Sequence, residues 1–186
     1  MKFIEIEYKY KIDANKRLAF KDLVKDIEGI SFVYIESYDI YYTRSDGEFL
    51  RYRYSEDKKQ KRAEITYKKK SIESNNVIRE EVNLRVDAND FETVDKFITG
   101  LDYKYNVKVF KACDIYETNE VQIVFYSVQD EENNWQSFVE IEVREGTFST
   151  EEEGVEIMRK YEKLLEPLGI TYQNRLSKSL YEMYKK

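Results

Sequence analysis

Hydrophobic and polar residues alternate with a period of two over much of this chain. Because successive side chains of a strand point to opposite faces, the alternation predicts strands with one apolar face and one polar face. We expect about eight strands by this criterion, at residues 3–12, 36–44, 48–55, 63–70, 78–86, 106–117, 121–128 and 136–145. The Asp46-Gly47 pair predicts a hairpin turn between the second and third strands.

Three stretches instead show the apolar spacing of helices, at residues 13–27, 90–101 and 150–168. Thr150 followed by Glu153 predicts a capping box at the start of the third helix, and Pro167 marks its end. A short helix is expected after Ser177. Strands and helices do not alternate regularly, so an all-β or α+β arrangement is favoured over a parallel sheet.

The polar faces of these strands carry paired glutamates at both ends of the sequence and pairs of arginine or lysine between them. The first strand places Glu5, Glu7 and Lys9 on one face. Later strands repeat the pattern with Arg51 and Arg53, with Thr66, Lys68 and Lys70, with Arg79 and Glu81, and with Glu140 and Glu142. Any one such strand is expected by chance in a chain with 37% charged residues. The whole set indicates polar faces that turn inward, because a solvated face usually mixes its signs and adds Ser, Thr and Gln.

Inward-facing glutamates would bring several carboxylates close together. Like charges so close to one another cannot all stay ionised without a compensating cation. The chain has no histidine and one cysteine, Cys113, which excludes a zinc site of the usual composition. Carboxylates suit a hard ion such as Mg²⁺ or Mn²⁺. The opposing lysines and arginines would hold the oxygens of a polyphosphate. The apolar faces would then point outward, beneath the helices.

Length and composition predict a single domain over residues 1–186, since one proline and six glycines leave no linker and 41% of the residues are hydrophobic. The net charge of −6 disfavours a nucleic-acid partner but allows a small, dense anion. The chain contains no 18-residue apolar run and no apolar segment near Met1. This pattern predicts a cytoplasmic protein without a membrane span.

The ordered motifs resemble the CYTH family, which includes class IV adenylyl cyclases, thiamine triphosphatases and inorganic tripolyphosphatases. Glu5-Ile6-Glu7-Tyr8-Lys9 is similar to the Glu-x-Glu-x-Lys signature that opens the family. The later motifs are similar, in order, to Leu50-Arg51-Tyr52-Arg53, Thr66-Tyr67-Lys68, Arg79-Glu80-Glu81, Phe138-Val139-Glu140-Ile141-Glu142 and residues 174–180. The resemblance implies an α+β fold, namely a closed eight-stranded antiparallel β-barrel that forms a triphosphate tunnel, with helices packed outside.

The resemblance also implies the roles of individual residues. Mg²⁺ or Mn²⁺ would be bound by Glu5, Glu7, Glu81, Glu140 and Glu142. Phosphate oxygens would be bound by Lys9, Arg51, Arg53, Lys68, Lys70, Arg79 and Lys178. Lys111 and Tyr41 would form the lysine–tyrosine pair that orients the attacking water in some tripolyphosphatase-like members. The sequence departs from the family where Cys113 replaces an arginine, and where an expected aspartate falls near Tyr126 or Ser127.

The implied activity is metal-dependent hydrolysis of a triphosphate, either inorganic tripolyphosphate or a nucleoside or thiamine triphosphate. Three alternatives remain open: nucleotidyl cyclisation in the same cradle, a non-catalytic module that binds a nucleotide or polyphosphate, and an RNA triphosphatase. In most of these the partner is a small-molecule triphosphate or nucleotide. A homodimer through tyrosines such as Tyr34, Tyr38 and Tyr172 is a further alternative, although we rank a core position for these side chains first.

Overall fold

The computed structural model of the chain describes residues 4–45, 48–56, 60–68, 78–87, 90–144 and 146–186. In these segments the strands are β1 (Ile4–Ile12), β2 (Ser31–Thr43), β3 (Phe49–Glu56), β4 (Lys61–Lys68), β5 (Ile78–Val86), β6 (Lys104–Glu117), β7 (Val121–Gln129), β8 (Trp135–Val143) and β9 (Arg175–Leu176). The α-helices are α1 (Arg17–Val24), α2 (Phe91–Gly100), α3 (Glu151–Leu165) and α4 (Leu180–Tyr184). Short 3₁₀ turns occur at Ala14–Lys16, Glu166–Leu168 and Tyr172–Asn174.

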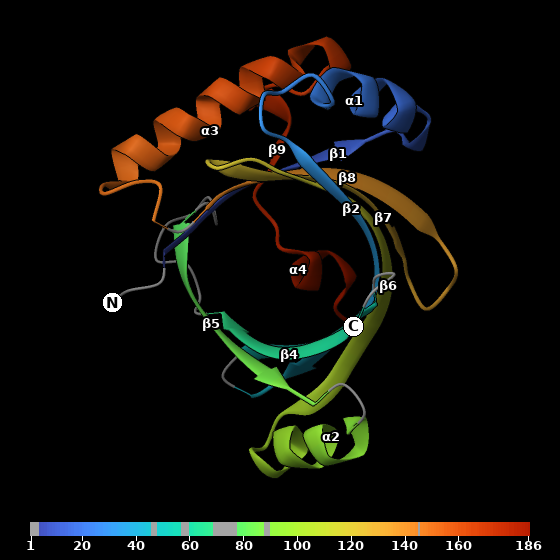
Figure 1. The fold of residues 1–186 in the computed structure, drawn as a ribbon. Helices are drawn as coiled ribbons and strands as arrows, with labels where there is room; N and C mark the ends of the chain where they lie inside the picture. The colour runs from blue at the N-terminus through green and yellow to red at the C-terminus, as the bar shows by residue number, and fades with distance from the viewer. Residues whose placement is uncertain (1–3, 46–47, 57–59, 69–77, 88–89, 145) are drawn as a thin grey trace.

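The strands form one antiparallel sheet in the order β5-β4-β3-β2-β6-β7-β8-β1-β9. β1 also pairs with β5 through three residue pairs, from Ile4 opposite Glu80 to Ile6 opposite Ile78. Figure 1 shows the strands arranged around a ring, from β5 and β4 through β6, β7 and β8 to β1. The predicted antiparallel sheet with helices is confirmed, but the sheet has nine strands, because Arg175–Leu176 adds a short strand beside β1. The sheet order itself is open, from β5 to β9. Closure into the expected barrel therefore rests on the three residue pairs between β1 and β5 and stays a prediction.

Most outward-facing apolar side chains of the strands are covered by helices, as the alternation predicts, whereas Val82 and Leu84 of β5 are exposed. Ile6 of β1 and Ile141 of β8 are fully buried in one cluster with Phe20 of α1 and Met158 of α3. A second cluster joins the outer faces of β2, β3 and β4 to α2. Figure 1 shows α1 and α3 on one side of the ring and α2 on the opposite side.

The C-terminal helix α4 corrects the expectation that all helices pack outside, because it lies inside the ring (Figure 1). Tyr181 stacks on Phe49 at 4.5 Å between ring centroids and lies 5.7 Å from Tyr41. Leu180 joins them in a cluster with inward-facing apolar residues of β6 and β7, including Val128. This apolar part of the interior explains why a helix with buried aromatic side chains packs there.

The tyrosines that we ranked as core residues are on the surface, so that ranking is wrong. Tyr34, Tyr38 and Tyr172 are 36%, 42% and 70% exposed, respectively. Cationic side chains lie over these rings: Arg17 over Tyr34, and Lys108 over Tyr38 at 4.3 Å from the centroid. Such contacts stabilise an aromatic ring at an exposed position.

Two sequence-based expectations fall outside the described residues, namely the hairpin turn at Asp46-Gly47 and the end of the fourth strand at Lys69 and Lys70. The other predicted strands agree with the structure to within a few residues, except that β2 begins earlier, at Ser31. No helix in the described segments is both long and apolar enough to cross a membrane.

Gly154, the one glycine of α3, lies close to Ile6 of β1. A Cβ at Gly154 would lie 2.3 Å from Cδ1 of the fully buried Ile6. Alanine has a helix propensity better by about 1 kcal/mol, but overpacking a core costs about 1–3 kcal/mol. We therefore expect Gly154→Ala to lower the free energy of unfolding by up to about 2 kcal/mol, as measured by urea denaturation.

Gly100 in α2 is the matched control, because nothing lies within 4 Å of a Cβ built there. Gly100→Ala should leave the free energy of unfolding unchanged or raise it slightly. Ile6→Val in the Gly154→Ala background removes Cδ1 and should recover part of the loss. A double variant that is less stable than Gly154→Ala alone would contradict the close-approach explanation.

Candidate functional site

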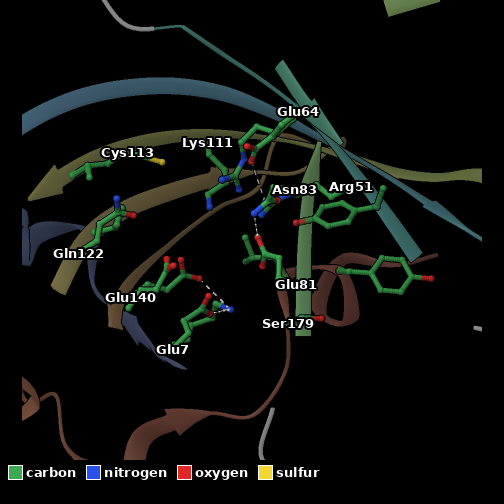
Figure 2. Close-up of a pocket in the computed structure, with 18 of the residues that line it drawn as sticks. Glu7, Arg51, Glu64, Glu81, Asn83, Lys111, Cys113, Gln122, Glu140 and Ser179 are labelled. Atoms are coloured by element: carbon green, nitrogen blue, oxygen red, sulfur yellow. Dashed lines mark hydrogen bonds and ion pairs between the residues drawn. The ribbon is translucent and has the colours of Figure 1, made fainter. Parts of the chain in front are cut away.

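The interior of the ring contains a cavity of about 260 Å³ whose wall carries both acidic and basic side chains. Of the predicted site residues, the structure brings together in this wall Glu7, Lys9, Tyr41, Arg51, Arg53, Glu81, Lys111, Glu140 and Glu142. Figure 2 shows Glu7 and Glu140 side by side at one end of the view and Arg51 at the other. The prediction that charged faces of several strands share one enclosed space agrees with this arrangement.

The acidic side of the cavity is built by β1 and β8. Glu7 is the direct cross-strand partner of Glu142, and Lys9 is the partner of Glu140. Lys9 Nζ donates a hydrogen bond to Glu7 Oε1 at 2.9 Å and lies 3.1 Å from Glu140 Oε1. Like charges on paired positions, such as Glu7 and Glu142, repel. The buried ammonium group of Lys9 offsets the charges of Glu7 and Glu140. Lys9, which we expected among the phosphate ligands, therefore contacts the acidic side.

The donor chemistry of this acidic side fits a hard divalent cation. Glu7, Glu140 and Glu142 offer carboxylate oxygens to one cavity, the ligand type that Mg²⁺ and Mn²⁺ prefer. Among the described residues, however, no three carboxylate, thiol or imidazole groups converge closely enough to hold an ion. The side chain of Glu5, a fourth expected ligand, lies outside the described part of the structure.

Tyr126 completes the acidic side from β7. Its hydroxyl group donates to Glu140 Oε1 at 2.5 Å, and the ammonium group of Lys111 lies 4.1 Å from the centroid of its ring. Burial, then the charge of Glu140, raises the pKa of Tyr126 well above its ordinary value. The neutral hydroxyl group is thus a donor where an aspartate was expected from the family pattern.

The basic side consists of Arg51 and Arg53 from β3 and Lys111 from β6. Arg53 donates to both carboxylate oxygens of Asp39, at 2.6 and 2.7 Å. Burial alone would raise the pKa of Asp39, but Arg53, with Arg51 and Lys111 near it, holds that pKa well below its ordinary value. Asp39 is therefore ionised at neutral pH inside the basic side.

A chain of hydrogen bonds connects the basic side with Glu81 across three strands. Arg51 Nη2 donates to Thr66 Oγ1 at 2.9 Å, and Thr66 Oγ1 donates to Asn83 Oδ1 at 2.7 Å. Asn83 Nδ2 then donates to Glu81 Oε1 at 2.8 Å. Figure 2 shows Arg51, Asn83 and Glu81 in this order. Arg51, Thr66 and Asn83 each direct one donor along the chain and Glu81 accepts the last bond, which fixes the orientation of both charged groups.

The suggested pair of Lys111 and Tyr41 lines the cavity from β6 and β2. Burial, followed by the charge of Asp39, raises the pKa of Tyr41, so its phenol group stays protonated at neutral pH. Burial likewise raises the pKa of the Cys113 thiol, which lies in the same wall. Tyr41 can serve as a hydrogen-bond donor in the cavity, and Cys113 is a neutral group there.

The other predicted ligands are not placed in the cavity wall. Lys178 is exposed and does not line the cavity. Lys70 lies outside the described residues, and for Lys68 and Arg79 the structure describes the strands but not the side chains. Their strand positions are opposite charged partners, because Lys68 pairs with Glu81 and Arg79 pairs with Glu5.

Several wall residues were missed by sequence reasoning, namely Glu64, Asn83, Gln122, Ser179 and Tyr181, together with Asp39 behind the wall. A signal existed for two of them. Asn83 is two residues from Glu81, and Asp39 is two residues from Tyr41, so each shares a strand face with a residue that we did select.

These features define an antiparallel sheet protein with outer helices and a charged interior. Residues 4–176 match the family model of the CYTH domain, so the chain belongs to the CYTH family. No curated protein matches the chain.

Solved structures with a similar fold extend over nearly the whole chain. The PH1012 protein of Pyrococcus horikoshii is 26% identical with a TM-score of 0.71, and the match covers 97% of this chain and 99% of that one. The PH1819 protein of the same organism is 24% identical with a TM-score of 0.75, covering 96% and 97%. A Hippeastrum protein assigned as an adenylyl cyclase, for which a dominant triphosphatase activity is described, is 13% identical with a TM-score of 0.66, covering 99% and 95%.

Proposed function

We propose that this CYTH protein hydrolyses a triphosphate, inorganic or organic, with Mg²⁺ or Mn²⁺ as cofactor. One observation carries the proposal: a single cavity of about 260 Å³ has Glu7, Glu140 and Glu142 in one part of its wall and Arg51, Arg53 and Lys111 in another. In this proposal β1 to β8 act as a closed tunnel joined by the β1–β5 pairing. The triphosphatase activity described for the Hippeastrum protein of similar fold supports it.

The basic side binds the non-bridging oxygens of the substrate. Arg51 and Arg53 present planar guanidinium groups that suit bidentate contact with phosphate. As the terminal phosphoryl group is transferred to water, these fixed cations stabilise the charge that spreads over its oxygens. Lys68, Lys70 and Arg79 are proposed as further phosphate ligands.

The acidic side would hold the metal through Glu7, Glu140 and Glu142, together with Glu5 and Glu81. A divalent cation bound there would supply positive charge that polarises a phosphoryl oxygen. Lys9, which contacts Glu7 and Glu140 in the structure, is proposed as a further phosphate ligand that would face the substrate if a metal ion took its place beside these carboxylates. Lys111 and the protonated phenol of Tyr41 orient the attacking water by hydrogen bonding.

The test is to measure release of orthophosphate from tripolyphosphate, ATP and thiamine triphosphate, each with Mg²⁺ or Mn²⁺ and with EDTA as the metal-free control. We expect turnover of at least one substrate that EDTA abolishes. Formation of cyclic AMP with pyrophosphate would favour cyclisation instead. Tight binding of tripolyphosphate without any product, by protein shown to be folded, would favour a non-catalytic module and reject hydrolysis.

A further inference from the structure

We propose that Asp39 is a positioning residue of the cavity, which fixes the guanidinium group of Arg53 and reduces the positive charge that the wall presents to an anion. The inference rests on the proposed function, because it takes a triphosphate as that anion. In this inference Asp39 has two effects: it weakens binding of the anion, and it speeds the reaction of the bound anion.

The contact between the two residues is bidentate and comes from neighbouring strands. Asp39 of β2 and Arg53 of β3 are direct cross-strand partners. Arg53 Nε donates to Asp39 Oδ1 at 2.6 Å, and Nη2 donates to Oδ2 at 2.7 Å. These are the hydrogen bonds that the side chain of Arg53 makes among the described residues. Two parallel bonds fix the plane of the guanidinium group and leave its Nη1 for a ligand.

Asp39 lies behind the arginine and not in the cavity wall. Asp39 is fully buried, whereas the Arg53 side chain is 25% exposed and lines the cavity. A ligand in the cavity therefore meets Arg53, and Asp39 acts on it only through Arg53 and through its charge. This placement makes Asp39 a positioning residue.

The charge of Asp39 opposes the attraction of the basic side for an anion. Arg51 and Lys111 are close enough to Asp39 to lower its pKa, together with Arg53. One carboxylate among three cations cancels part of their field, and charges in a partly buried site interact more strongly than in water. The charge of Asp39 thus weakens binding of the anion in the ground state. Its two hydrogen bonds with Arg53 favour the transition state, because a guanidinium donor that is already in place needs no reorganisation.

These two effects have opposite signs, which gives the test. Asp39→Asn keeps the shape of the side chain, removes its charge and replaces one acceptor oxygen by an NH₂ group. We expect tripolyphosphate to bind about 3–10-fold more tightly, measured by titration calorimetry without divalent cations. We expect kcat for triphosphate hydrolysis to fall about 10–100-fold. Structural damage alone would weaken both binding and turnover.

Asp114 offers a matched control on the outer face of β6. It is also a buried carboxylate with a bidentate arginine, since Arg17 Nε and Nη2 donate to it at 2.5 and 2.7 Å. Asp114→Asn removes the same kind of contact outside the ring. It should lower Tm while leaving kcat and tripolyphosphate affinity unchanged.

A double variant separates positioning from other effects on turnover. In an Arg53→Ala background no guanidinium group remains to be fixed, so Asp39→Asn should no longer lower kcat. Weaker tripolyphosphate binding by Asp39→Asn, or an equal loss of kcat in the Arg53→Ala background, would overturn the assignment. If the wild type hydrolyses no triphosphate, the proposed function fails, and the binding measurement alone decides the role of Asp39.

Should circular dichroism show that Asp39→Asn is unfolded, Arg53→Lys replaces it in the test. Lysine keeps the positive charge but has no planar fork. We expect a lower kcat and a tripolyphosphate affinity closer to that of wild type than the affinity of Arg53→Ala, because the positive charge stays in the wall. An unchanged kcat would overturn the assignment.

Discussion

Glu7→Gln is expected to lower kcat/KM for triphosphate hydrolysis about 100-fold or more at a fixed, subsaturating concentration of Mn²⁺. Glutamine has the size of glutamate but lacks its negative charge, so the acidic side loses one of the groups that we propose to hold the metal. The amide oxygen can still accept the hydrogen bond from Lys9 that Glu7 accepts at 2.9 Å. The loss should therefore reflect chemistry rather than unfolding, and steady-state phosphate release at several Mn²⁺ concentrations measures it.

The matched control for Glu7→Gln is Glu36→Gln. Glu36 is exposed on β2, where it accepts a hydrogen bond from the hydroxyl group of Tyr34. This substitution makes the same charge change away from the cavity and should leave kcat/KM within about twofold of wild type. Full activity of Glu7→Gln, with an unchanged dependence on Mn²⁺, would show that the acidic side does not hold the metal.

Arg175→Ala is expected to lower the free energy of unfolding by about 3–5 kcal/mol at pH 7. Arg175 Nε donates to Glu162 Oε1 at 2.6 Å, Tyr10 OH donates to the same oxygen at 2.6 Å, and the guanidinium group lies 3.5 Å from the centroid of Tyr8. Glu162 is only 8% exposed. Without Arg175 the Glu162 carboxylate keeps its hydrogen bond from Tyr10 but loses the positive charge of the guanidinium group beside it. Urea denaturation at equilibrium measures the loss.

The loss in Arg175→Ala should depend on pH in a defined direction. Burial raises the pKa of Glu162, but hydrogen bonds from Arg175 and Tyr10 outweigh it and lower that pKa below its ordinary value of 4.5. A group with a lowered pKa stabilises the fold above its unfolded pKa and loses that contribution as the pH falls through the folded pKa. The stability difference between wild type and Arg175→Ala should therefore shrink below about pH 4.5.

Arg175→Ala combined with Glu162→Gln gives the control for this interpretation. The double variant leaves no buried charge, so it should recover part of the lost stability at pH 7. Its stability should also depend less on pH than that of Arg175→Ala. A stability difference between wild type and Arg175→Ala that stays constant from pH 7 to low pH would exclude the buried carboxylate as the cause.

The fold was predictable where local periodicity carries the information. β5 has the predicted bounds of 78–86, and the capping box of Thr150 and Glu153 starts α3 as expected. β9 was missed, because two residues are too short to show any alternation. The position of α4 inside the ring depends on its contacts with Phe49 and Tyr41. These residues are distant from α4 in sequence, so no local pattern predicts the contacts.

The candidate site was predictable where a strand repeats one charge on one face, as Arg51 and Arg53 do. Asp39 was missed because its face continues with Ser37 and Tyr41, so no charge repeats there. Its role appears only when β2 and β3 are paired. Lys178 was selected from the resemblance, yet it precedes the N-cap Ser179 of α4 and is exposed.

The pairing of β1 has a consequence for folding during synthesis. Residues 7–12 of this first strand pair with β8, near the other end of the chain, and Lys9 and Tyr10 pair with β9. A chain emerging from the ribosome therefore carries these residues without their edge partner until β8 has been made. Such late, long-range pairing slows folding and leaves an unpaired edge on which nascent chains can aggregate. Chaperone binding to the nascent chain should concentrate in this interval.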